Sequence, residues 1–238
     1  MDLLSPFLAT DPASPRLTTY TDAGRMELSA ATLANWAAKG GNLMAGELGL
    51  GPGDVVVVDA PADWMPAAIV VGCWRAGVAV CSPDAPAAAS AAAVVTTDPD
   101  AHPDTDAEIL QLSTDPFGRG VAEAGGDVDF GVTDLSPELR VQGDRYAGPE
   151  TGGRDGAETV LLHASDGSEV TGAQLRERAA QRFEAGTRAV TGAWADTDGL
   201  VDTLLPLFVG GSVVASTDDA AERLRHLAET ERGTVTPR

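Results

Sequence analysis

Basic residues are scarce in this sequence, and Lys39 is its only lysine. The 238 residues include 16 lysines and arginines against 36 aspartates and glutamates, which gives a formal net charge of -20 at pH 7. A chain this acidic cannot neutralise a run of phosphates or settle on an anionic membrane, so nucleic acid and membrane surfaces are excluded as partners. The composition fits either a high-GC genome or adaptation to salt, and it does not separate the two.

Cysteine and histidine, which most often bind zinc, are also rare. Cys73 and Cys81 lie in apolar stretches, which favours buried, reduced thiols over the alternative of a catalytic cysteine. The histidines are too far apart in the sequence for a metal site and are His102, His163 and His226. Four aspartates hint at calcium but are interrupted by prolines, as in an acidic loop: Asp98, Asp100, Asp104 and Asp106. We therefore assign no catalytic residue, no metal and no cofactor.

Long apolar runs are absent as well. No run reaches the length that spans a bilayer, and residues 1–10 lack the basic start and small-residue cleavage site of a secretory signal. These absences predict a cytoplasmic protein. With 43% apolar residues and a mean hydropathy of -0.04, the chain is expected to bury a core as one domain or two closely packed lobes.

The first half of the sequence alternates short apolar runs with helical periods. A hairpin is expected at residues 17–28, followed by a helix that Ser29 caps. Residues 54–59, 78–81 and 93–96 then read as buried strands, with a helix over 61–77 between the first two. Strand, helix and strand in this order predict parallel pairing through a right-handed crossover.

The second half repeats a hairpin followed by a helix. The hairpin turns at Asp166 and Gly167, and Thr171 with Gln174 forms a capping box before a helix that runs to about residue 184. Further elements are expected as a helix over 199–208, a strand over 212–216, a helix over 220–230 and a strand over 234–236.

These elements predict an α/β fold of two small lobes, each with a parallel or mixed sheet flanked by helices. The first lobe is expected to span residues 1–97 and the second residues 157–238. Residues 98–156 are acidic and rich in proline and glycine, so we expect a surface connection with little regular structure apart from a short strand at 109–112.

Three segments resemble successive parts of the N-terminal domain of adenylate-forming enzymes, the superfamily of acyl-CoA synthetases. Residues 27–55 resemble the opening helix of that domain with its glycine-rich turn and strand, and residues 204–214 (LLPLFVGGSVV) a later helix and strand. The most specific is WRAGVAVCSPD at residues 74–84, which is similar to the motif K-A-G-A-x-x-x-P-x-D with Arg75 in place of lysine. These motifs belong to the scaffold of the domain. The resemblance therefore implies the fold of that domain and not its activity.

The loop that holds ATP in the family, T-S-G-T-T-G-x-P-K-G, is degenerate at the corresponding place. Residues 163–172 read HASDGSEVTG, so Ser165, Asp166, Gly167 and Ser168 stand where the phosphates would be held. A two-residue Asp-Gly turn is expected here, which is too tight to surround a triphosphate. Asp166 and Glu169 also place negative charge where phosphate would lie, and the lysine is gone.

The resemblance further implies that the chain stops before the adenine site and the C-terminal domain with its catalytic lysine. We therefore expect a truncated, non-catalytic scaffold that binds a protein partner, a second copy covering the truncated face, or a small acyl or nucleoside ligand. One alternative is half of a split adenylating enzyme whose partner supplies the missing parts. Another is a ligand site between the lobes, lined by Trp64, Trp74 and Trp194, although aromatic residues near helices are more often core residues.

Overall fold

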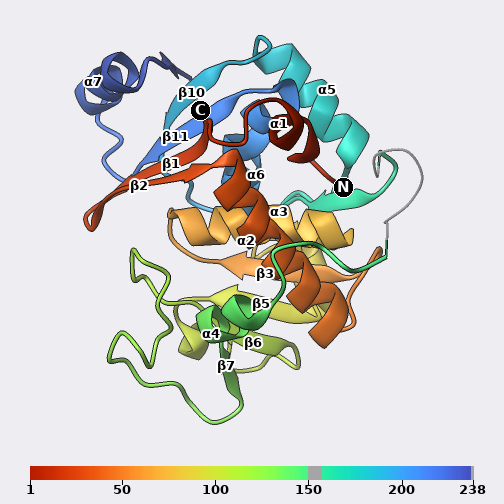
Figure 1. Cartoon of the computed structure of the whole chain (residues 1–238). Helices are drawn as coiled ribbons and strands as arrows, with labels where there is room; N and C mark the ends of the chain where they lie inside the picture. The colour runs from red at the N-terminus through yellow and green to blue at the C-terminus, as the bar shows by residue number, and fades with distance from the viewer. Residues whose placement is uncertain (150–156, 237–238) are drawn as a thin grey trace.

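The computed structural model describes residues 1–149 and 157–236, in which two sheets pack with helices between and around them (Figure 1). The five-stranded sheet has the order β12 (Thr234–Val235), β10 (Arg188–Gly192), β11 (Ser212–Ser216), β1 (Pro15–Thr21) and β2 (Gly24–Ser29). The seven-stranded sheet has the order β7 (Val132–Asp134), β6 (Glu108–Gln111), β5 (Ala93–Thr96), β3 (Val55–Asp59), β4 (Ala79–Cys81), β8 (Val160–His163) and β9 (Glu169–Thr171). The α-helices are α1 (Ser5–Thr10), α2 (Ala30–Asn42), α3 (Trp64–Ala76), α4 (Leu135–Val141), α5 (Gly172–Arg182), α6 (Thr197–Leu204) and α7 (Ala221–Glu231). The predicted α/β class is confirmed.

The elements with clear sequence signals form where they are expected. The Ser29 hydroxyl caps α2 by accepting a hydrogen bond from the Thr32 amide, and Thr171 and Gln174 form the predicted capping box of α5. Strand β3 pairs in parallel with both β4 and β5, as the crossover rule requires. Helix α3 begins at Trp64 and not at residue 61, because the Asp63 side chain caps it by accepting from the Trp64 amide at 2.7 Å.

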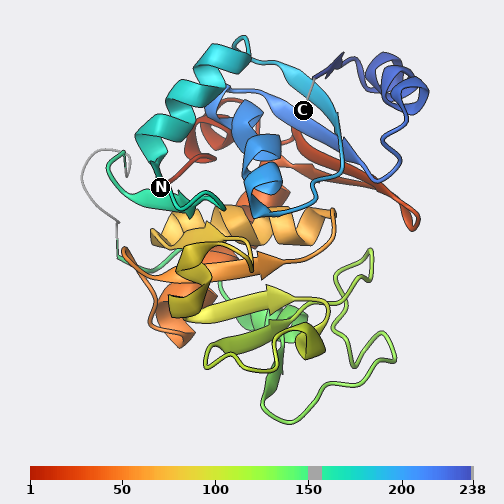
Figure 2. The same cartoon turned by 180° about the vertical axis from the view of Figure 1, so that it is seen from behind.

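Helix α3 is the centre of the molecule and lies between the two sheets (Figure 2). All of its residues except Arg75 are buried, which explains its apolar character on every side. It crosses α2 so closely that a Cβ atom on Gly72 would lie 3.0 Å from Gly40 Cα. Any side chain at this position would therefore push the two helices apart. No helix of the described ranges is both long and apolar enough to cross a bilayer.

The two sheets do not follow the predicted division into lobes 1–97 and 157–238. The first hairpin, β1 and β2, joins the later strands, because β1 pairs in parallel with β11 (Leu17 opposite Val213). The hairpin β8 and β9 joins the early strands, because β8 pairs with β4 (Leu162 opposite Val80). Sequence patterns reveal local hairpins but not the distant strand that each one joins. The two halves are therefore interlocked through exchanged hairpins.

The predicted connection over residues 98–156 also needs correction, although residues 150–156 lie outside the described ranges. The expected strand near 109–112 is present as β6, but β7 and α4 follow it and complete the edge of the seven-stranded sheet. Leu135 and Leu139 of α4 are fully buried. Two apolar residues one helical turn apart are too short a pattern to separate a helix from a loop.

Helix α1 and strand β10 have no recognisable sequence pattern, and the helix predicted over 199–208 is only partly α-helical. The sequence did not predict strand β10 or helix α1, although β10 is an interior strand that lies between β12 and β11. The apolar helix predicted over 199–208 begins at Thr197 as α6. From Leu205 to Val209 the chain continues as a 3-10 helix, and Pro206 lies in the first turn of that segment. Proline lacks the amide that an α-helix needs at an interior position.

Helix α7 is attached to the outer face of the five-stranded sheet by a cluster of charged groups. Its Glu231 accepts hydrogen bonds from the Tyr20 hydroxyl at 2.6 Å, from Arg25 Nε at 2.8 Å and from Arg188. The Glu231 side chain is only 8% exposed, and hydrogen bonds from Arg25 above all lower its pKa to about 2. Leu227 is the one fully buried residue of α7. The charged cluster therefore supplies much of the attachment of this helix.

We expect Glu231→Gln to lower the free energy of unfolding by about 2 kcal/mol at pH 7, the scale of hydrogen bonds to a charged group. Glu229→Gln, on the same helix but exposed, is the matched control and should change little. The pKa of Glu231 lies below the value of about 4.3 in the unfolded chain, so its contribution is complete above that value and fades as pH falls towards 2. Urea unfolding should show the gap between the parent and Glu231→Gln narrowing in acid. A gap that is constant with pH would contradict this account.

Candidate functional site

The degenerate loop residues form the tip of the hairpin between β8 and β9. The Ala164 amide donates to the Ser168 carbonyl at 2.9 Å, and the Gly167 amide donates to the Ala164 carbonyl at 2.9 Å. Gly167 has a φ of +85°, in the left-handed region. The turn therefore has three residues between its paired ends, one more than the two-residue Asp-Gly turn predicted. This geometry is a type I turn followed by a left-handed glycine, the usual three-residue hairpin.

All amides of residues 164–168 except that of Asp166 already donate hydrogen bonds within the protein. Besides the two bonds above, Ser165 N donates to Asp198 Oδ2 at 3.0 Å and Ser168 N donates to Asp166 Oδ1 at 2.8 Å. A loop that binds phosphate needs amides that point outward with no partner of their own. The hydrogen bonds of this turn are made mainly within the hairpin, while the residues that form its tip are exposed to solvent: Ser165, Asp166, Gly167 and Ser168.

Negative charge surrounds the same turn. Hydrogen bonds from the side chain and amide of Ser168 lower the pKa of Asp166, so its carboxylate is charged at neutral pH. Glu169 is exposed beside it, and Asp198 lies beneath Ser165. Glu169 Oε1 is also 4.0 Å from Nδ1 of His163, which is partly buried at the end of β8. A polyphosphate at this position would face carboxylates at short range.

Helix α6 connects the turn to the carboxyl ends of β3 and β4. The buried Thr197 at its first position donates through Oγ1 to the Val58 carbonyl at 2.7 Å and to the Cys81 carbonyl at 3.1 Å. The Thr197 amide donates to the Ser82 hydroxyl at 3.0 Å. One residue later, Asp198 accepts from the turn. The start of α6 therefore holds the turn and the central strands in fixed relative positions.

A cavity of about 350 Å³ lies at these carboxyl ends, a position where α/β sheets commonly bind ligands. Its lining includes the carboxylates of Asp59, Asp84 and Asp196 together with Ser82 and Trp194. Asp59 is also paired with His102, at 3.0 Å between Oδ2 and Nε2. Such a lining disfavours an anionic ligand. Among the described residues, no group of three or more His, Cys, Asp or Glu side chains could hold a metal ion.

A second cavity, of about 210 Å³, lies on the other side of Trp194, between α5, α6 and β10. Phe183, Ala189 and Pro206 contribute apolar walls. Arg182 and Asp202 form an ion pair at 2.5 Å beside it. The dimensions and the lining suit a small apolar group.

Of the tryptophans predicted to line a site between the lobes, only Trp194 does so. Trp74 is fully buried, donates from Nε1 to the Leu161 carbonyl at 2.9 Å and packs edge-to-face against Phe208. Trp64 is buried against Trp36. Both are core residues of the α3 helix, which is the more common position for such aromatic residues, and the alternative of a ligand site fails for these two. No periodic pattern of apolar residues around Trp194 could have told this tryptophan apart from the two core tryptophans.

The two cysteines are buried free thiols, in keeping with the favoured interpretation. Burial raises the pKa of Cys73 to about 12. Burial also raises the pKa of Cys81 to about 12, with smaller contributions from the charges of Asp198 and Asp84. Only a thiolate is a strong nucleophile, and neither thiol ionises near neutral pH. This environment disfavours the alternative of cysteine catalysis.

We expect Gly167→Ala to destabilise the chain by about 1 to 2 kcal/mol, because the left-handed conformation is strained for a residue with a Cβ atom. The new Cβ would meet only Pro86 Cγ, at 3.6 Å, so no clash adds to the strain. Gly46→Ala is the control, since Gly46 is helical and a Cβ there meets nothing within 4 Å. That substitution should be neutral or stabilising by up to about 1 kcal/mol. Equal unfolding midpoints for the two variants would show that the turn is not constrained as described.

The solved structures that this chain resembles include acyl-CoA synthetases. A Brucella canis acyl-CoA synthetase superposes with a TM-score of 0.75 at 17% identity, covering 99% of this chain and 47% of that one. ATP-bound MatB from Rhodopseudomonas palustris gives 0.68 at 18% identity, covering 98% and 48%. A Mycobacterium tuberculosis fatty acyl CoA synthetase gives 0.67 at 14% identity, covering 97% and 47%. At such identities the likeness shows the fold alone, and the chain spans about half the length of these structures.

No protein-family model matches the chain. A curated protein of Mycobacterium tuberculosis (strain ATCC 25618 / H37Rv), a "TIGR03089 family protein", is 37% identical over 248 residues. That alignment covers 98% of this chain and 95% of the relative. An identity of this level over nearly the whole of both chains shows that this protein belongs to the TIGR03089 family, and its fold is that of about half of an acyl-CoA synthetase.

Proposed function

We propose that this chain is a non-catalytic member of the adenylate-forming fold that binds a small acyl group and does not form adenylates itself. The observation that carries the proposal is the closed turn at residues 164–168, in which every amide except that of Asp166 donates inside the protein. Activation of a carboxylate with ATP depends on positioning the triphosphate and stabilising its charge. A turn that uses the amides of Ala164, Ser165, Gly167 and Ser168 for its own bonds leaves too few donors for either task.

The position of the only lysine supports the same proposal, although Arg178 acts electrostatically on Asp166. Lys39, the only lysine, forms an ion pair with Asp144 at 2.9 Å and is bound to the 140–142 segment, far in sequence from the turn. Asp166, Glu169 and Asp198 surround the turn instead. A split enzyme, in which a second chain supplies the adenine site and a lysine, would also have to replace this turn. The non-catalytic proposal requires no such replacement.

The cavity beside Trp194 is the part of the site best suited to a ligand. Its apolar walls from Phe183, Trp194 and Pro206 suit a short acyl chain, and its volume of about 210 Å³ limits the ligand to a small group. The carboxylate-lined cavity on the other side of Trp194 suits the neutral or hydrogen-bond-donating end of such a ligand. An acyl group in amide or thioester linkage meets both requirements, since it carries no charge at the acyl carbon.

We expect magnesium ATP to leave the thermal unfolding midpoint of this chain unchanged at millimolar concentration. MatB, whose solved structure contains bound ATP, is the positive control. A ligand at 100 times its Kd stabilises a protein by about 2.7 kcal/mol, which raises the midpoint of a chain of this size by about 5 to 10 °C. Stabilisation of this order by magnesium ATP would overturn the proposal. Pyrophosphate exchange on adding a second chain would favour the split enzyme.

We expect short acyl amides, or short acyl thioesters that lack the phosphates of coenzyme A, to raise the midpoint, and Thr203→Phe to abolish this effect. Thr203 lines the cavity from α6, so a phenyl ring there occupies the space for the acyl chain. Thr230→Phe, on the exposed face of α7, is the matched control and should respond like the parent. Stabilisation that persists in Thr203→Phe would place the ligand elsewhere. Silence across the whole panel would instead favour a protein partner or a second copy, which light scattering can detect.

A further inference from the structure

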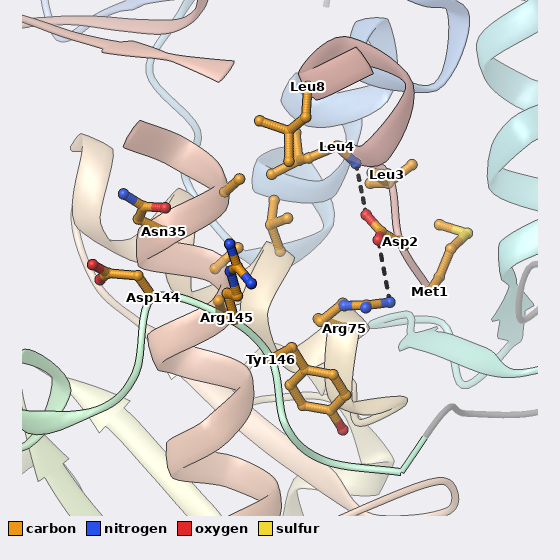
Figure 3. Close-up of a pocket in the computed structure, with 14 residues that line it drawn as sticks. Met1, Asp2, Leu3, Leu4, Leu8, Asn35, Arg75, Asp144, Arg145 and Tyr146 are labelled. Carbon is orange, nitrogen blue, oxygen red and sulfur yellow. Dashed lines mark hydrogen bonds and ion pairs between the residues drawn. The ribbon is translucent and has the colours of Figure 1, made fainter. Parts of the chain in front are cut away.

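A third cavity, of about 320 Å³, lies between the N-terminal segment, α2 and the end of α3 (Figure 3). It is separate from the turn and from both cavities at Trp194, and it shares no lining residue with either. Its apolar lining comes from both sides of the groove and consists of Leu3, Leu4, Leu8, Ala34, Ala37, Ala38 and Val71. A volume of this size is at the lower end of the range for small-molecule sites.

One wall of this cavity is a strap, residues 142–147, that α2 holds in place. Lys39 donates to the Gln142 carbonyl at 2.5 Å and pairs with Asp144 at 2.9 Å. Asn42 donates from Nδ2 to the Gly143 carbonyl at 3.1 Å and to the Arg145 carbonyl at 2.9 Å. Asn42 Oδ1 also accepts from the Ala147 amide at 2.8 Å. The backbone is therefore fixed on both sides of Arg145.

Two of the cations around the cavity form ion pairs, whereas a third, Arg145, forms none with the described residues. Lys39 is paired with Asp144, and Arg75 is paired with Asp2 at 3.4 Å and lies over the Tyr146 ring. Within residues 1–149 and 157–236, the guanidinium of Arg145 has no hydrogen-bond or ion-pair partner, and it rises from the strap into the cavity towards Leu4 and Leu8 (Figure 3). In a chain with a net charge of -20, an unpaired guanidinium beside apolar walls is the feature that calls for a ligand.

We propose that this cavity binds a small monocarboxylate with an apolar body. The planar guanidinium of Arg145 can donate two parallel hydrogen bonds to a carboxylate, and the apolar body would lie against Leu4, Leu8 and Val71. A phosphate ester is disfavoured, because its second negative charge would face Asp2 and Asp144 across the cavity. The site does not depend on the function proposed above, since neither the turn nor Trp194 contributes to it.

Titration of the chain with octanoate, followed by isothermal calorimetry, tests the proposal. We expect saturable binding that is at least ten-fold weaker for octanamide, which has the same shape and no charge. Arg145→Gln should weaken octanoate binding at least ten-fold, because it removes the charged partner. Arg225→Gln on α7 also removes one positive charge from the surface and should bind octanoate like the parent. Ala34→Phe, which fills the cavity from α2, should abolish binding.

The contrary outcomes are equally distinct. Equal affinity of the parent and Arg145→Gln would overturn the proposal, as would no saturable binding up to about ten millimolar, a concentration at which a guanidinium–carboxylate site of this kind should saturate. Loss of binding in Arg182→Gln with retention in Arg145→Gln would move the carboxylate to the cavity beside Trp194. If Ala34→Phe fails to fold, the exposed Arg145→Gln variant still decides the question.

Discussion

A backbone amide donates one hydrogen bond, and in the hairpin between β8 and β9 all the turn amides except that of Asp166 donate inside the protein. Ser165 N binds Asp198, Ser168 N binds Asp166, and the remaining bonds close the turn across itself. Because Asp198 belongs to the first turn of α6, the hairpin is also tied to Thr197, whose hydroxyl holds the carboxyl ends of β3 and β4 together. The turn is therefore part of the scaffold that shapes the cavities on either side of Trp194. To open it for a phosphate, the chain would have to break several of these contacts together.

The scaffold around this turn depends on one buried helix and on two exchanged hairpins. Helix α3 is in contact with strands of both sheets, and its approach to α2 at Gly72 leaves no room for a side chain. Hairpin β1 and β2 completes the sheet of the later strands, and hairpin β8 and β9 extends the sheet of the early ones. Movement of one sheet against the other would disturb the shared core. The interlocked sheets contribute walls to the cavities at the carboxyl ends of their strands.

Local signals in the sequence were sufficient for much of the fold. The Ser29 cap, the capping box of Thr171 and Gln174 and the buried run of β3 each act through neighbouring residues, and each forms as expected. Long-range pairing could not be read in this way, because the pairing of β1 with β11 depends on residues almost 200 positions apart. The site followed the same rule. The composition of the turn predicted a closed, acidic tip, whereas its third residue, the bond to Asp198 and the position of Arg145 depend on tertiary contacts.

Each backbone amide of the turn between β8 and β9 can be observed separately. The most direct measurement is a two-dimensional amide NMR spectrum of the ¹⁵N-labelled chain, recorded as magnesium ATP is added. Because the amides of Ser165, Gly167 and Ser168 donate inside the protein, we expect their signals to stay in place and their hydrogen exchange to remain slow. Saturable displacement of these signals, with faster exchange as the bonds within the turn open, would contradict this expectation.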